Sequence, residues 1–234
     1  MQPMEQQPTT PRVATTAGLR GASWAPDRME APFSARPYSL TTADKAAVQG
    51  VLYARGACDK VLVVMHPREF VMTHYLVPDA LDAGWACWVQ APRSIGSDLR
   101  LEHEAALLDV AAGMSHLRAL GFKTIVLLGN SGGAGLFAYY NQQSLLAPAQ
   151  RVTRSPGGRP YKLATAEMPA ADGIALVSPH PGQGILLMNA LDPSVLDESE
   201  PFPTDPALDP FSAANGFRAP PQSSRYADAF VQQY

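Results

Sequence analysis

Residues 123–144 read KTIVLLGNSGGAGLFAYYNQQS, and this stretch decides the fold. Its first part, residues 123–129, is a short continuous apolar run with β-branched residues, which is typical of a strand buried on both faces. The part after Ser131 has the composition of a helix. Between them, residues 129–133 (GNSGG) match the pattern G-x-S-x-G, in which a serine occupies a sharp strand-to-helix turn.

Similar apolar runs lie on both sides of this stretch. They predict strands at residues 61–67 (VLVVMHP), 85–92 (WACWVQAP) and 173–179 (GIALVSP), the last of which we expect to be buried as well. Residues 75–83 and 101–120 have helical patterns. Because strands and helices alternate, the sequence predicts an α/β fold with a mostly parallel sheet and helices on both faces.

Two further segments adjoin these elements. Residues 38–55 alternate loosely between apolar and polar, which predicts an antiparallel pair with a turn near residues 43–45. In the 101–120 helix we expect Glu102, Glu104 and Asp109 to form the solvated face, and Gly121 to end the helix. The apolar stripe of that helix comprises Leu107, Val110, Met114 and Leu117.

The composition divides the chain into three parts. Residues 1–36 have no apolar period and predict a mobile or loosely packed arm, whereas residues 37–190 carry the alternating strands and helices. The 22 prolines crowd toward the two ends. Residues 191–234 are therefore predicted to lack long regular elements and to form a proline-rich lid or connecting segment.

Charge and composition exclude several classes of protein. The chain has 18 basic and 21 acidic residues, so no basic field favours nucleic-acid binding. It has no apolar run of membrane-spanning length and no secretory signal pattern at its start. Cys58 and Cys87 do not make a disulfide framework, and the five histidines lack the short spacings of metal ligands. We expect a cytoplasmic protein without a metal site.

The turn at Ser131 carries the strongest chemical signal. Glycines on both sides relieve the crowding of a tight turn, and the following helix N-terminus favours developing negative charge. A glycine-rich turn after a strand is also typical of phosphate binding, but the sequence contains neither G-x-G-x-x-G nor G-K-[ST]. The pattern therefore favours Ser131 as a nucleophile over a phosphate-binding turn.

From residue 38 to 188 the chain resembles the α/β-hydrolase family. Three features carry the resemblance: the antiparallel start at residues 42–53, the strand that ends in His66-Pro67 where the family usually has His-Gly, and the turn at residues 129–133. The resemblance implies an oxyanion hole made of two backbone N–H groups. One would come from Gly132 and the other from Arg68 or Glu69, with Arg68 preferred, because Pro67 has no N–H to donate.

The resemblance also implies a histidine base and an acid on later loops, and here the sequence departs from the family. The only histidine after Ser131 is His180, and no apolar strand follows residue 179. We expect the chain to be a fragment, or to be completed by a second polypeptide that supplies the base. In the alternative, His180 acts as the base with Asp192 or Asp197 as the acid.

The resemblance implies a serine hydrolase that cleaves a carboxylic ester or related acyl bond in a small molecule. Ser131 would form the acyl-enzyme and no cofactor would be needed. Residues 182–234 would then occupy the position of a lid, with apolar side chains that cover the acyl group or pack on a proline-rich surface: Met188, Leu191, Phe202, Phe211 and Phe217. A catalytically silent binding or assembly subunit is the alternative function.

Overall fold

The computed structural model describes residues 32–69, 71–97 and 101–234. Most of the predicted N-terminal arm lies outside the described residues. The chain divides into two compact units between Gly182 and Gln183. The predicted lid or connecting segment falls within the second unit.

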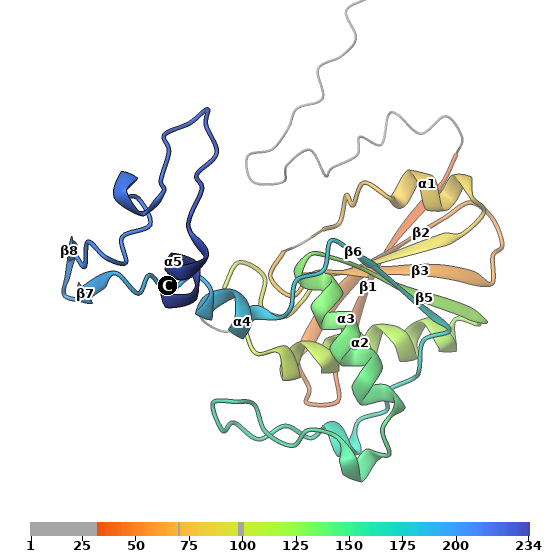
Figure 1. Ribbon diagram of the computed structural model, residues 1–234. Coiled ribbons are helices and arrows are strands. Elements are labelled where there is room, and N and C mark those ends of the chain that lie inside the picture. The colour runs from red at the N-terminus through yellow and green to blue at the C-terminus, as the bar shows by residue number, and fades with distance from the viewer. Residues whose placement is uncertain (1–31, 70, 98–100) are drawn as a thin grey trace, which may run out of the picture. The chain divides into compact units, whose positions relative to one another are not determined.

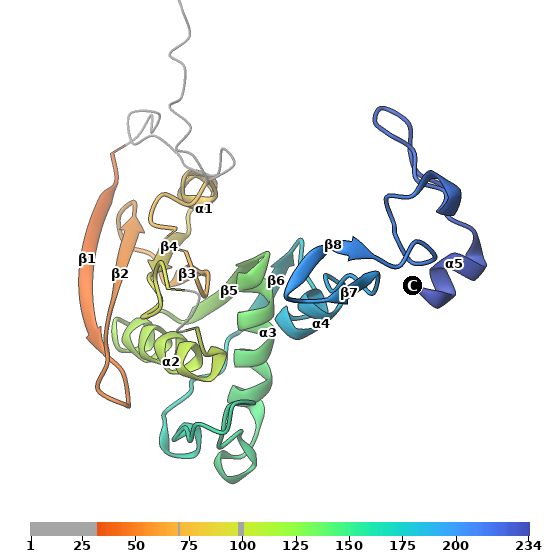
Figure 2. The ribbon, with the colours of Figure 1, turned by 90° about the vertical axis from the view of Figure 1, so that its left-hand side faces the viewer.

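A single six-stranded sheet organises the first unit, in the order β1-β2-β4-β3-β5-β6 from one edge to the other (Figure 2). The strands are β1 (Ser34–Thr41), β2 (Ala47–Ala54), β3 (Lys60–Met65), β4 (Ala86–Gln90), β5 (Thr124–Asn130) and β6 (Gly173–Val177). The pairs β1–β2 and β2–β4 are antiparallel, and the remaining pairs are parallel. The predicted mostly parallel sheet with an antiparallel start is thereby confirmed.

Helices cover both faces of this sheet (Figure 1). The short α1 (Val77–Asp82) packs on one face, where its Val77 and Leu81 are buried against β2, β3 and β4. The longer α2 (His103–Ala119) and α3 (Gly132–Leu145) pack on the other face. This is the α/β arrangement that the alternation of apolar runs predicts.

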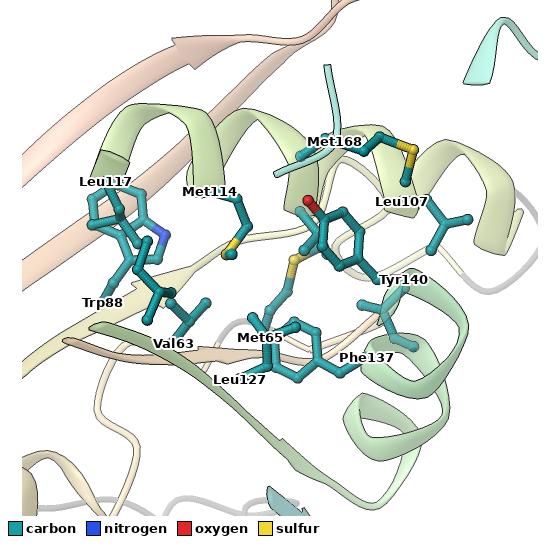
Figure 3. Close-up of a cluster of buried hydrophobic side chains, with 14 of the residues drawn as sticks. Val63, Met65, Trp88, Leu107, Met114, Leu117, Leu127, Phe137, Tyr140 and Met168 are labelled. Carbon is teal, nitrogen blue, oxygen red and sulfur yellow. The ribbon is translucent and has the colours of Figure 1, made fainter. Parts of the chain in front are cut away.

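The main core lies between the sheet and the two longer helices (Figure 3). The predicted stripe of α2 is confirmed, because all four of its residues are at most 1% exposed. The largest side chains that fill this core are completely buried: Trp88 from β4, and Phe137 and Tyr140 from α3. The core fixes α3 against the carboxyl ends of β3 and β5, and therefore fixes the turn that precedes α3.

The predicted solvated face of α2 is wrong for two of its three acidic residues. Glu104 is 6% exposed and Asp109 is 0% exposed. Asp109 receives hydrogen bonds from the main chain and side chain of Arg93, at 2.9 and 2.7 Å. Tyr139 donates to Glu104 at 3.3 Å. Each carboxylate is buried because a partner from another element satisfies it.

The prediction that residues 173–179 form a buried strand is wrong in its burial. β6 is the edge of the sheet, and of its residues Ile174 and Leu176 are 38% and 46% exposed. The strand itself is confirmed by its parallel pairing with β5. β6 pairs with β5 on one side only, and no other described strand pairs with its outer edge.

Residues 147–171 connect α3 to β6 without a regular helix or strand. They contain two short 3-10 turns, η3 (Pro148–Gln150) and η4 (Leu163–Thr165). The Arg151 side chain is buried there and donates hydrogen bonds to the carbonyl oxygens of Gln143, Leu163 and Ala166. A charged side chain thus takes the place of secondary structure in satisfying these carbonyls.

The second unit consists of short elements, as its prolines predict. They are α4 (Gln183–Met188), β7 (Val195–Asp197), β8 (Glu200–Thr204), η5 (Ala213–Asn215) and α5 (Asp228–Gln233). The apolar side chains expected to form a lid are mostly exposed, and Phe202 is 94% exposed. Phe211 and Phe217 lie against each other with ring centroids 5.6 Å apart. In the part of the chain that the structure describes, no helix is long and apolar enough to cross a membrane.

Candidate active site

The strand-to-helix turn at Ser131 has the strained backbone that the sequence pattern predicts. Ser131 has φ 53° and ψ −120°, between the end of β5 and the start of α3. A non-glycine residue rarely adopts a positive φ, and a residue held there is stabilised by its surroundings. The Ser131 N–H donates to the carbonyl oxygen of Val177 at 2.9 Å, which ties the turn to β6.

Glycine is required on both sides of the serine because the main chain passes too close for a side chain. A Cβ on Gly129 would lie 2.4 Å from the Cα of Ala134. A Cβ on Gly133 would lie 2.5 Å from the carbonyl oxygen of Met65, at the end of β3. Both contacts are with main-chain atoms, which cannot rotate away. The glycines therefore allow the turn to pack directly on the sheet.

This geometry presents the serine at the end of a helix. Ser131 is exposed, and its Oγ makes no hydrogen bond to any residue that the structure describes. It immediately precedes the 14-residue α3, whose first N–H groups have no partner within the helix. Those N–H groups and the helix dipole favour negative charge beside Ser131.

His66 lies beside the turn, at the end of β3. It is 9% exposed, and its Nδ1 accepts hydrogen bonds from the N–H groups of Arg68 and Glu69, each at 3.2 Å. The Nε2 atom is on the side of Gly132, because a Cβ on that glycine would lie only 2.8 Å from it. Ser94 fixes the same loop by donating to the carbonyl oxygen of Pro67 at 2.8 Å.

The predicted oxyanion donors lie in two places, at the start of α3 and in the loop after β3. Gly132 follows Ser131, the predicted nucleophile, and is the first residue of α3. The N–H groups of Arg68 and Glu69, the two alternatives for the second donor, are both directed at His66 Nδ1. In this arrangement they hold the imidazole ring. The role of Arg68 as an oxyanion donor stays a prediction.

His180, the predicted base, follows the carboxyl end of β6, on the same side of the sheet as the carboxyl end of β5, which Ser131 follows. Its Nδ1 accepts a hydrogen bond from the N–H of Gly182 at 3.1 Å, which leaves the ring proton on Nε2. A triad histidine needs the opposite tautomer, with a proton on Nδ1 and a lone pair on Nε2. The predicted acids Asp192 and Asp197 belong to the second unit, where they accept hydrogen bonds from Ser194 and Ser199.

His103 is a further titratable group of this region that the sequence did not identify. It begins α2, and burial lowers its pKa. Glu104 opposes this shift, whereas His180 and Arg68 reinforce it. Electrostatic interactions thus connect His103 with the loops that follow β3 and β6.

Two polar residues next to the turn also escaped prediction. Asn130 precedes the serine, and its Nδ2 donates to the hydroxyl oxygen of Tyr75 at 3.3 Å. Tyr75 stacks on the buried His74, with ring centroids 4.4 Å apart. His74 accepts a hydrogen bond on Nδ1 from the N–H of Leu76 at 3.3 Å. The segment that leads into α1 therefore forms one wall beside the turn.

A cavity of about 880 Å³ lies elsewhere in the first unit, and Ser131 is not among its lining residues. Arg93 in its wall pairs with Asp44, and Arg159 pairs with Glu102 at 3.0 Å. These carboxylates neutralise two of its cations. The candidate active site is therefore argued from the turn at Ser131 rather than from this cavity.

Comparisons with known proteins find similarity only at the level of structure. No protein-family model matches the sequence, and no curated protein matches it. An esterase from Pyrococcus furiosus is 21% identical with a TM-score of 0.42, over 53% of this chain and 50% of the esterase. Oligopeptidase B from Trypanosoma brucei is 16% identical with a TM-score of 0.41, over 48% of this chain and 19% of the peptidase.

A post-proline cleaving enzyme from Rickettsia typhi is 12% identical with a TM-score of 0.41, over 47% of this chain and 19% of the enzyme. The chain thus spans about half the length of the esterase and about a fifth of each peptidase. The sheet order, the flanking helices and the strained turn at Ser131 are the stronger observations. Together they make the described fold consistent with an α/β-hydrolase core, as the sequence resemblance predicts.

Proposed function

We propose that this chain is a serine hydrolase that cleaves a carboxylic ester or related acyl bond of a small molecule. The observation that carries the proposal is the strained, exposed Ser131 between a buried strand and the N-terminus of α3. A serine held at positive φ in this way supports a role in chemistry, because strained backbone of this kind is concentrated at functional sites. Esterase and peptidase activity in proteins of similar structure agrees with this proposal.

The reaction would proceed through an acyl-enzyme. Ser131 Oγ attacks the acyl carbon, its proton passes to a base, and the carbonyl oxygen becomes an oxyanion beside the N–H of Gly132. The C–O bond to the alcohol then breaks and the alcohol takes up the proton. Water attacks the acyl-enzyme in the same manner and releases the acid. The sequence of steps requires no cofactor.

The base is the part of this proposal that still needs a histidine in the right tautomer beside Ser131. His180 would serve only if the turn at residues 180–182 releases its Nδ1 and the ring changes tautomer. We propose instead that further residues of the protein, or a second polypeptide, supply the histidine. The open outer edge of β6 supports this choice, because no described strand pairs with it and a parallel strand added there would end in a loop on the same side of the sheet as Ser131.

A catalytically silent binding or assembly subunit is the second candidate function. The observation in its favour is the state of the histidines: His66, His74 and His180 each accept a main-chain N–H on Nδ1. None of these three rings is in the tautomer of a triad base. If no other histidine reaches Ser131, the turn would be retained without activity.

Covalent labelling separates the two functions. The 234-residue chain is purified together with any polypeptide that accompanies it and is treated with a fluorophosphonate, and intact mass reports the adduct. An activated serine forms the O–P bond as fluoride leaves and the proton passes to the base. We expect an adduct that Ser131→Ala abolishes and that Ser144→Ala, on the helix that follows Ser131, retains. Absence of labelling in a folded chain, alone and with any polypeptide that co-purifies, would favour the silent subunit.

A further inference from the structure

We propose that the cavity of about 880 Å³ in the first unit binds a small organic molecule that carries a phosphate monoester. Its walls come from residues 43–45 in the turn between β1 and β2, from the first two turns of α2, and from residues 159–162 in the connection from α3 to β6. Arg93, in the loop after β4, completes the lining. Ser131 does not line this cavity, so the inference goes beyond the proposed hydrolase function and does not depend on it.

Arg93 holds the walls of the cavity together. Its guanidinium pairs with Asp44 at 2.5 Å and with the buried Asp109 at 2.7 Å, and it also donates to the Thr42 hydroxyl at 3.3 Å. These contacts fix the β1–β2 turn against α2. The two carboxylates neutralise this cation, so the affinity of the cavity for an anion must come from other side chains.

Three other cationic groups in the lining retain donors for a ligand: Lys45, Arg159 and Lys162. Among the residues that the structure describes, neither lysine amine has an ion pair or a hydrogen bond. Arg159 contacts the Glu102 carboxylate through Nε at 3.0 Å, and its two Nη groups make no further contact with a described residue. Because Glu102 also accepts a hydrogen bond from Tyr161, one shared carboxylate opposes three cations on this side of the cavity.

The backbone of Lys45 supports a role for its side chain. Lys45 has φ 71°, in a turn closed by hydrogen bonds of 2.9 Å from its N–H to the carbonyl oxygen of Thr42 and from the N–H of Thr42 to that of Ala46. Glycine is favoured at such a position in a hairpin turn, because other residues are strained there. Strained residues of this kind are concentrated at functional sites. The turn itself does not need an amine, which points to a ligand in the cavity that Lys45 lines.

A phosphate monoester suits this set of donors better than a single carboxylate does. It carries close to two negative charges at neutral pH and has three terminal oxygens, enough acceptors for all three cationic groups. An arginine fork and lysine point charges are both common partners of phosphate. Ala105, Leu108 and Pro160 add apolar surface to the lining, and the volume lies within the roughly 300–1,000 Å³ of small-molecule sites. The cavity therefore has room and surface for an organic group beside the phosphate.

Binding is measured by NMR titration of the full ¹⁵N-labelled chain with phenyl phosphate. Phenyl sulfate and succinate are the comparison ligands: the first has the same shape with one negative charge, and the second has two charges on separate carboxylates. We expect phenyl phosphate to bind with a Kd on the order of 1 mM or tighter, and about fivefold or more tighter than either comparison ligand. The amides that shift should include those of residues 43–45 and 159–162.

Substitutions identify the groups that bind. Arg159→Met and Lys162→Met should each weaken phenyl phosphate binding about fivefold or more, whereas Lys162→Arg, which keeps the charge, should stay within about threefold of wild type. Lys45→Gly removes an amine where glycine is the favoured residue, so it should weaken binding without lowering the midpoint of urea unfolding. Lys123→Met is the control, because it removes an exposed amine that does not line the cavity.

Each other result would overturn the proposal. No amide shift with about 10 mM phenyl phosphate would exclude the site, and equal affinity for succinate or phenyl sulfate would exclude phosphate as its preferred ligand. An equal loss in Lys123→Met would mean that net charge governs binding and that the cavity does not. Urea unfolding of every variant confirms that the compared chains are folded. Labelling of Ser131 tests the hydrolase function separately, so either idea can fail without the other.

Discussion

The pair formed by Arg93 and Asp109 allows a quantitative test of how this fold is held together. Asp109 is 0% exposed in the middle of α2, and burial raises the pKa of its carboxyl although Arg93 opposes the shift. The Arg93 guanidinium lies 2.7 Å from the Asp109 carboxylate and 2.5 Å from that of Asp44. One side chain therefore connects the end of β4, α2 and the β1–β2 turn.

Replacing Arg93 with Met removes the cation and leaves the carboxylate of Asp109 in place. Only the main-chain N–H of Arg93, at 2.9 Å, would still satisfy that buried charge. Breaking a buried ion pair from one side costs about 3–5 kcal/mol. This is a large part of the 5–15 kcal/mol that ordinarily separates folded from unfolded domains. We expect Arg93→Met to lower the free energy of unfolding by about 3–5 kcal/mol.

A second substitution tests the reason for this loss. In Arg93→Met with Asp109→Leu no unpaired buried charge remains, because Asp44, which also loses Arg93, is partly exposed to solvent, and we expect about 1–4 kcal/mol to be recovered. Urea unfolding followed by tryptophan fluorescence measures all variants, since Trp88 is fully buried. Lys123→Met is the control, because the Lys123 side chain is 81% exposed and its amine lies 3.6 Å from the Asp59 carboxylate; a change of about 0.5 kcal/mol or less is expected. The reasoning fails if Arg93→Met costs no more than this control, or if the double variant is less stable than Arg93→Met.

Three further predictions follow from close contacts and buried charges. Gly133→Ala should lower the free energy of unfolding by about 1–3 kcal/mol and abolish labelling, because the new Cβ would lie 2.5 Å from the Met65 carbonyl oxygen. Gly135→Ala, whose Cβ would have nothing within 4 Å, should instead raise the free energy of unfolding by up to about 1 kcal/mol. Equal effects of the two substitutions in urea unfolding would contradict this reasoning. Arg151→Met should cost about 3 kcal/mol in the same assay, because three buried carbonyls lose a charged donor; a neutral result would contradict it. Burial lowers the pKa of His74 from 6.5 to about 4. The contribution of neutral His74 to folding stability is therefore complete above pH 6.5 and is lost toward pH 4, because the unfolded chain takes up the proton first. Between these pH values the free energy of unfolding should fall by about 3 kcal/mol more in wild type than in His74→Asn, and parallel curves of stability against pH would refute this.

Local pattern was sufficient for the elements that carry their own signal. The apolar run at residues 123–129 became β5, and the glycines around Ser131 produced the strained turn where expected. Both follow from interactions within a few residues, the steric limits of a tight turn and the burial of a strand between two layers. This is why the sheet, its helices and the candidate nucleophile could be predicted without any long-range information.

Burial that depends on a distant partner could not be predicted in the same way. A charged residue opposite the apolar stripe of a helix is ordinarily solvated, which placed Asp109 on the wrong face. Its burial is explained by Arg93, sixteen residues earlier, which no helical period encodes. β6 shows the converse error. An apolar run predicts that a strand can be buried, but it does not indicate which element, if any, covers that strand. Ile174 and Leu176 are therefore apolar and exposed at the edge of the sheet.

The states of the histidines, by contrast, do have a signal in the sequence. His66 and His180 each precede a proline, and proline has no N–H. The first main-chain donor that can fold back on Nδ1 is then two residues on, and in both cases it does so: Arg68 on His66 and Gly182 on His180. The His-Pro dipeptide thus favours a proton on Nε2 at both positions. The same local chemistry opposes His180 as the base, which is the physical reason to look for the base beyond this turn.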